Sequence, residues 1–189
     1  MNLTLKPGST AKSAYNLRDP ADEGLERHTL SVLVDNEPGV LARVIGLFSG
    51  RGYNIESLTV AETDHTGHRS RITIVTVGTP AVIDQIHAQL ERMVPVYGVN
   101  DLDKEGRYVE RELGLFKVVA SGEARVEALR MAEIMGARVV DVTPNSFIFE
   151  LAETSEQIDA FAELMRPLGL VEQARTGVAA MLRGGEAMG

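Results

Sequence analysis

The sequence has no cysteine and no tryptophan, and only 5% of its 189 residues are aromatic. Without thiols, the chain can form no disulfide, no zinc–thiolate site and no cysteine nucleophile. Its net charge of −8 opposes binding to a phosphate backbone, and few aromatic rings are present to stack on bases. The composition therefore argues against nucleic-acid binding and against thiol chemistry.

Long apolar segments are missing too. No run approaches the roughly 18 to 20 apolar residues that cross a bilayer, and the N-terminus lacks the apolar core of a secretory signal. We therefore predict a cytoplasmic protein with no membrane association. Residues 1–27 carry only scattered apolar side chains among proline, glycine, serine and charges, too few to offset the entropy of ordering. We expect a flexible tail at 1–27 and a short one at 184–189.

Catalytic motifs are also absent. The sequence has no G-x-S-x-G elbow and no H-E-x-x-H, and its G-L-F-S-G-R-G segment lacks the lysine of a phosphate loop. Asp64, His65 and His68 could be imagined as metal ligands, but their position around Gly67 favours a solvent-exposed hairpin turn. We predict no catalytic residue and no metal site.

Two periodicities organise the rest of the chain. Every second residue is apolar in 29–34, which is typical of a strand. Leu41, Val44, Ile45 and Phe48 follow at the spacing of an amphipathic helix. The further elements predicted in this unit are a strand at 54–62, a strand at 71–77, a helix that opens at Thr79 and Pro80, and a strand at 95–100. This βαββαβ order is that of the ferredoxin-like fold.

A polar stretch at 101–112 is predicted to link this unit to a second one. The elements predicted there are strands at 113–121, 137–142, 146–151 and 168–174, and helices at 123–135 and 155–165. Their order is βαββαβ again. The sequence thus predicts an α+β protein made of two ferredoxin-like domains, at residues 28–103 and 104–183.

The segment D-N-E-P-G-V-L at 35–41 joins the first strand to the first helix and is the candidate binding site. Pro38 fits a first helical turn, where the missing N–H would have no partner in any case. Gly39 and Val40 are expected to offer free N–H groups at the positive end of the helix dipole, which suits a carboxylate. Asn36 carries a donor and an acceptor for the charged ends of an amino acid. Ordinary capping of the helix by Asn36 explains the turn equally well.

The longer run DNEPGVLARVIGLFSGRGYNIESLTV resembles the start of the small, regulatory subunits of acetohydroxyacid synthase, also called acetolactate synthase. The similarity continues in SRITIVTVG, YVERELGLFKVVASG, VVDVTP and ARTGVAAMLRG, and it covers about residues 28–183. It implies that the first domain is an ACT domain, a βαββαβ unit that binds small molecules. It also implies that the chain forms a homodimer.

The same resemblance implies that the chain works through a partner. That partner is a catalytic subunit that uses thiamin diphosphate, Mg²⁺ and FAD and makes precursors of the branched-chain amino acids. The small subunit would bind no cofactor, activate the partner and confer feedback inhibition by valine. Carried onto this sequence, the effector site comprises Asn36, Gly39 and Val40, with Asn54 and Ile55, at the opening of the second strand, contributed by the other copy.

Three other functions share parts of this pattern. An enzyme with fused effector-binding modules would need a catalytic domain, and two small domains already account for residues 28–176. An ACT-type, amino-acid-binding regulator of another biosynthetic enzyme would share both the fold and the turn at 35–41. An RNA-binding ferredoxin-like protein is disfavoured by the negative charge and the scarcity of aromatic residues.

Overall fold

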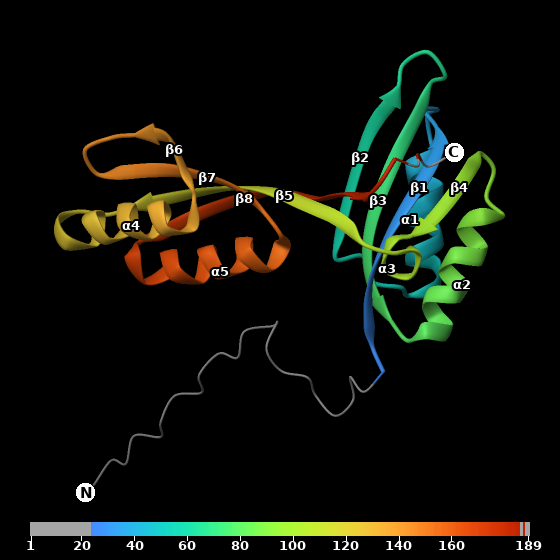
Figure 1. Cartoon of the computed structure of the whole chain (residues 1–189), viewed down its shortest axis with the longest axis horizontal. Coiled ribbons are helices and arrows are strands. Elements are labelled where there is room, and N and C mark those ends of the chain that lie inside the picture. Colours follow the sequence, from blue (N-terminus) through green and yellow to red (C-terminus); the bar gives the residue numbers. More distant parts are fainter. Residues whose placement is uncertain (1–23, 186, 188–189) are drawn as a thin grey trace, which may run out of the picture.

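The computed structural model describes residues 24–185 and residue 187. Within that part, the chain forms two four-stranded antiparallel sheets, with helices packed against each (Figure 1). The strand orders are β2-β3-β1-β4 and β6-β7-β5-β8, so the two units repeat one topology. The predicted fold class, two ferredoxin-like βαββαβ units, is confirmed. No helix among the described residues is both long and apolar enough to cross a membrane.

The first unit buries one face of its sheet under two helices. Leu30 and Val32 of the first strand are fully buried and belong to one cluster with Val44 and Phe48 of the first helix. Apolar side chains recur every second residue in the strand and about every 3.6 residues in the helix, so they all point to the face that the two elements share. The elements of this unit are β1 (Glu26–Asp35), α1 (Val40–Arg51), β2 (Ser57–Asp64), β3 (Arg69–Gly78), α2 (Pro80–Glu91) and β4 (Val96–Asp101).

The second unit has an aromatic core. Phe161 lies edge-on to Phe116 and Phe149, with ring centroids 4.9 and 6.0 Å apart. All three rings are fully buried. The elements of this unit are β5 (Tyr108–Val119), α4 (Gly122–Met135), β6 (Arg138–Val142), β7 (Ser146–Glu153), α5 (Ser155–Met165), the 3₁₀ turn η2 (Arg166–Leu168) and β8 (Leu170–Leu182), preceded by the short helix α3 (Leu102–Glu105).

A two-stranded ribbon joins the units. β5 and β8 pair from Val118 and Leu170 at one end to Tyr108 and Leu182 at the other, and Figure 1 shows them running from the second sheet to the first. The far end of the ribbon packs on the first unit through a third small buried cluster, formed by Val75, Leu102, Val178 and Ala180. The two units therefore share a packed interface.

The prediction of a polar linker at 101–112 is wrong. Part of this stretch is helix α3, and residues 108–112 begin β5. Its carboxylates have partners elsewhere in the fold: Glu110 pairs with Arg27 at 3.4 Å, and Glu112 is buried beside Arg175 at 2.6 Å. Charges that are satisfied across a fold look the same in a sequence as charges that face solvent.

Several element boundaries also differ from the predictions. β1 begins at Glu26 rather than at residue 29, and β2 begins at Ser57 rather than at residue 54. β8, predicted to end at residue 174, continues to Leu182. Residues 1–23 of the predicted flexible tail lie outside the described residues, as do residues 186, 188 and 189 of the predicted C-terminal tail. Glu26 and Arg27, which the tail prediction included, belong to β1, so the tail was predicted too long.

Candidate functional site

The turn between β1 and α1 is built around a left-handed glycine. Gly39 is the N-cap of α1 with φ of +91°, and an added Cβ would meet no atom within 4 Å. Glycine adopts this conformation without the steric cost of a side chain. Pro38 lies in the turn and not in the first turn of the helix, so its predicted placement at N1 is wrong. The left-handed turn, which the sequence pattern did not specify, delays the start of α1 to Val40.

The helix start offers free N–H groups, and the predicted pair of donors is right only in part: the Gly39 N–H has no acceptor among residues 24–185. The N–H of Val40 already donates to Glu37 O at 3.3 Å, so its prediction as a free donor is wrong. The first bond from an N–H to the carbonyl four residues earlier runs from Arg43 to Gly39 O at 3.0 Å. Leu41 and Ala42 precede that bond, and no acceptor for their N–H groups is found among residues 24–185. These two donors stand at the positive end of the helix dipole.

Asn36 does not cap the helix. Its backbone N–H donates to His68 O at 2.6 Å, which ties the turn to the β2–β3 hairpin. The side chain is exposed, and α1 has no side-chain capping bond. Capping, which explained the turn as well as binding did, is therefore excluded as the role of Asn36.

Asn54 and Ile55 lie at the opposite end of α1, in the loop before β2. Asn54 is exposed, and its carbonyl accepts a bond from Thr76 Oγ1 at 2.6 Å. Ile55 packs against the edge of the first core. α1 has 12 residues, which span about 18 Å at 1.5 Å per residue. One chain therefore does not bring Asn54 and Ile55 to the turn that holds Asn36 and Gly39, and a shared site needs a second copy.

Sequence reasoning missed a polar group beside the turn. Tyr97 of β4 donates to Asp35 Oδ1 at 2.7 Å, and the guanidinium of Arg69 lies 4.4 Å from the centre of the Tyr97 ring. The bond to Asp35 raises the pKa of the Tyr97 hydroxyl. Arg69 sits opposite Asp35 in the β1–β3 register, so a cation stands at the rim of the turn. No local pattern links residues so far apart, and only the strand register brings them together.

Asp64, His65 and His68, considered above as metal ligands, form the turn of the β2–β3 hairpin. Asp64 Oδ1 accepts bonds from the N–H groups of Thr66 and Gly67 at 2.9 and 3.0 Å. The side chains of His65 and His68 are 86% and 81% exposed. The prediction of a solvent-exposed turn is confirmed by this arrangement.

A buried histidine–carboxylate group was not foreseen. His28 Nδ1 lies 2.9 Å from both carboxylate oxygens of Asp101, and both side chains are buried. Asp103 is nearby, where it accepts a bond from the Thr29 N–H at 2.7 Å. Burial by itself lowers the pKa of His28, but the hydrogen bonds that its ring donates to Asp101 and Glu26 outweigh burial, and the pKa is raised overall. These groups satisfy one another and tie β1 to the end of β4.

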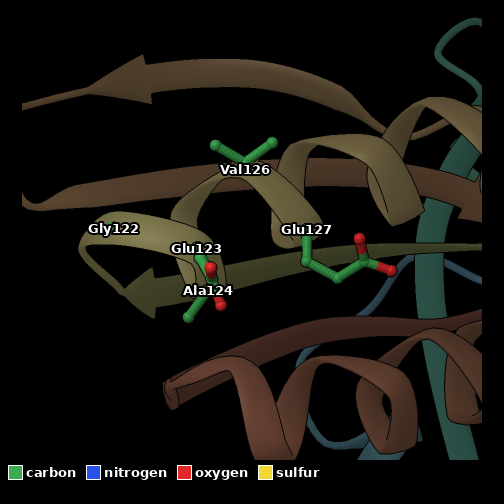
Figure 2. Close-up of a pocket in the computed structure, with 5 residues that line it drawn as sticks. All are labelled: Gly122, Glu123, Ala124, Val126 and Glu127. Carbon is green, nitrogen blue, oxygen red and sulfur yellow. The ribbon is translucent and has the colours of Figure 1, made fainter.

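A surface pocket lies far from the turn, on the second unit. It is lined by Gly122, Glu123, Ala124, Val126 and Glu127 along the first turns of α4 (Figure 2). Two of these side chains are carboxylates and none is cationic, so the lining is poorly suited to the carboxylate of an amino acid. The candidate effector site therefore stays at the turn.

Comparison with known proteins places this geometry in a family. Residues 30–98 match the model of the AHAS small subunit-like ACT domain, and residues 111–184 match the model of the small subunit of acetolactate synthase. The chain is 50% identical over 163 residues to the acetolactate synthase isozyme 3 small subunit of Salmonella typhimurium, over 86% of this chain and 99% of that protein. This chain belongs to the acetolactate synthase small subunits.

Other acetolactate synthase small subunits agree with this placement. A probable small subunit from Archaeoglobus fulgidus is 46% identical, over 84% of this chain and 98% of that protein. The crystal structure of the acetolactate synthase small subunit from Thermotoga maritima superposes with a TM-score of 0.76 at 36% identity, over 85% of this chain and 99% of that one. The turn at 36–40 and the loop at 54–55 both fall inside the matched ACT domain.

Proposed function

We propose that this chain is the non-catalytic regulatory subunit of acetolactate synthase. It binds the catalytic subunit, activates it and makes it sensitive to feedback inhibition by valine. Family membership supports the assembly. The observation that carries the regulatory role is the exposed start of α1, where Gly39 leaves open space next to the N–H groups of Leu41 and Ala42, which have no acceptor within the described part of the chain. Such a helix start accepts a carboxylate.

In this proposal the effector lies between two copies of the chain. The N–H groups of Leu41 and Ala42 bind its carboxylate, and the Asn36 carboxamide oxygen accepts from its ammonium group. Asn54 and Ile55 of the second copy close the site, with Ile55 against the branched apolar side chain. Val40 contributes through its place in the first helical turn, because its own N–H is engaged.

The wider assembly follows from the same proposal. Residues 28–103 form the effector-binding ACT domain, residues 104–183 form the second domain, and the chain acts as a homodimer in the cytoplasm. Thiamin diphosphate, Mg²⁺ and FAD belong to the catalytic subunit. In support, the sequence has no Gly-Asp-Gly segment of the kind that begins a metal–diphosphate site in thiamin-dependent enzymes.

Reconstitution with the catalytic subunit tests this function. Acetolactate formation is measured with the catalytic subunit alone, with this chain alone, and with both across a valine titration. We expect no turnover by this chain alone, a higher rate for the pair, and loss of that rate as valine is added. Turnover of pyruvate by the isolated chain contradicts the proposal. Valine binding with no effect on acetolactate formation would instead favour a regulator of another biosynthetic enzyme.

A further inference from the structure

Two hydroxyl groups of β2 hold one residue of β8 across the boundary between the units. Ser57 Oγ accepts from the Val178 N–H at 2.9 Å, and Thr59 Oγ1 donates to Val178 O at 2.7 Å. Their side chains are two residues apart on a strand and so project from one face. β8 is an edge strand of its sheet, so the hydroxyls satisfy backbone groups that an edge leaves unpaired. We call these three residues the β2–β8 joint.

The joint is fitted too closely to be an incidental contact. Gly177 has φ of +83°, and a Cβ there would lie 2.8 Å from Ser57 Oγ and 3.0 Å from Thr59 Cγ2. Backbone conformation and lack of space both require glycine at this position. The Val178 side chain is buried in a cluster with Val75, the residue that pairs with Ser57 in the β2–β3 register.

On one side, the joint continues directly into the proposed effector site. The carbonyl of Asn54 is held by Thr76 Oγ1 at 2.6 Å, and the N–H of Glu56 donates to Val75 O at 2.8 Å. Residues 54–57 are thus fixed along β3 as one short segment. This segment links Asn54 and Ile55 directly to Ser57.

On the other side, the joint connects to helix α5 of the second unit. Val178 lies opposite Glu112 in the β5–β8 register, and Glu112 carries a buried carboxylate. That carboxylate accepts from Arg175 at 2.6 and 2.8 Å and from Ser155 Oγ at 3.0 Å. Ser155 is the first residue of α5. Backbone segments, strand pairing and side-chain hydrogen bonds therefore connect the loop at 54–55 to the start of α5.

We propose that the β2–β8 joint transmits effector occupancy from the ACT unit to the second unit. This inference rests on the proposed function, and it assigns Ser57 and Thr59 a positioning role that is separate from effector binding. Coupling between sites travels through packed and hydrogen-bonded contacts, but contiguity becomes coupling only when both sites change together. The test must therefore separate binding of valine from inhibition by valine.

The experiment compares hydroxyl-deleted variants in the reconstituted holoenzyme. Ser57→Ala and Thr59→Val remove the two hydroxyls, Thr59→Ser keeps the hydroxyl, and Thr143→Val removes a hydroxyl bonded to Ser146 in the distant β6–β7 turn. Valine affinity is measured by calorimetry, and activation and valine inhibition by acetolactate formation. We expect the Ser57 and Thr59 deletions to keep valine affinity within about threefold but to reduce the inhibition reached at saturating valine by about twofold or more. The Thr59→Ser and Thr143→Val variants should behave as wild type.

The outcomes separate this inference from the proposed function. Deletion variants that bind valine and are inhibited as wild type overturn the role of the joint. A wild-type chain that neither binds valine nor confers inhibition overturns the proposed function instead. If the deletion variants do not fold, hydrogen exchange of the wild-type holoenzyme decides. Valine should change the exchange of residues 175–182, and unchanged exchange there overturns the joint.

Discussion

At the scale of single residues, Gly39 meets two requirements: the turn needs a left-handed backbone there, and the proposed effector needs open space. Its φ of +91° is a conformation that glycine adopts readily, and the space beside it is open. A side chain at this position therefore meets no steric clash with the fold, but it carries a backbone cost of roughly 1 to 2 kcal/mol, which is smallest for asparagine and aspartate. The open space is what an approaching effector needs.

Gly39→Asp should separate regulation from activation. The new carboxylate would occupy the space of the effector's carboxylate and compete for the N–H groups of Leu41 and Ala42, so valine inhibition should be lost while activation of the catalytic subunit is largely kept. The variant should also lose about 1 kcal/mol of unfolding free energy through the left-handed backbone. A valine titration of the holoenzyme and a denaturant melt measure the two effects.

Gly46 provides the matched control. It lies inside α1, and an added Cβ there also meets no atom within 4 Å. Gly46→Ala should raise the unfolding free energy by about 0.5 to 1 kcal/mol through helix propensity and keep the wild-type response to valine. If Gly39→Asp folds and is inhibited by valine as wild type, the turn at 36–40 is a chain connection and not the effector site.

At the scale of elements, the two units repeat more than their topology. Thr79 and Thr154 are the N-caps of α2 and α5, and four residues later Ile83 and Ile158 are both fully buried. Only Thr154 accepts a capping bond through its side chain. The two units therefore share the start of this helix and the helix face that packs on the sheet, but the hydrogen bonds at the helix start differ.

The contact between β1 and β4 should depend on pH through His28. Its pKa is raised in the folded protein above the ordinary value of 6.5, so the charged form stabilises the fold. That contribution is fully present below the unfolded pKa and is lost as pH rises through the folded pKa. We expect the denaturant midpoint to fall as the pH rises above the ordinary histidine pKa of 6.5, and Asp101→Asn to lower the midpoint and weaken that slope.

A histidine outside the pair serves as the control for this pH dependence. His65 is exposed at the β2–β3 turn, so His65→Gln should leave the slope unchanged. The interpretation fails if Asp101→Asn keeps the slope of the wild-type protein, because the pH dependence would then come from other groups.

At the scale of the whole molecule, the two halves of the proposed site lie at opposite ends of α1, about 18 Å apart along the helix. A site that uses both halves needs two chains related by a two-fold axis, so that each copy gives one half to each site. This geometry predicts how variants should combine.

Two defective variants should complement each other when mixed. Asn36→Ala and Asn54→Ala homodimers should each bind valine weakly. After co-refolding at equal amounts, half of the dimers are mixed, and each mixed dimer has one intact site, so about a quarter of the sites should bind as wild type. Calorimetry measures the recovered sites. A strictly monomeric mass by light scattering, with or without valine, or no recovery on mixing, contradicts a shared site.

The sequence by itself determined the two βαββαβ units, because each apolar period is a local property that survives any tertiary arrangement. It also located the turn at 35–41, where Asn, Pro and Gly are all local signals. It misplaced the start of α1, because a left-handed glycine before the helix moves the helix start without changing the composition of the turn. For the same reason the engaged N–H of Val40 was not foreseen.

Only the tertiary structure decided how the units meet. Glu110 and Glu112 looked like linker residues until Arg27 and Arg175 were found beside them, and the partners are 83 and 63 residues away in the chain. No local pattern could predict the β2–β8 joint either, because Ser57 and Val178 are 121 residues apart in the chain. Partners at such separations are set by strand order and register, which depend on packing of the whole chain rather than on any segment of it.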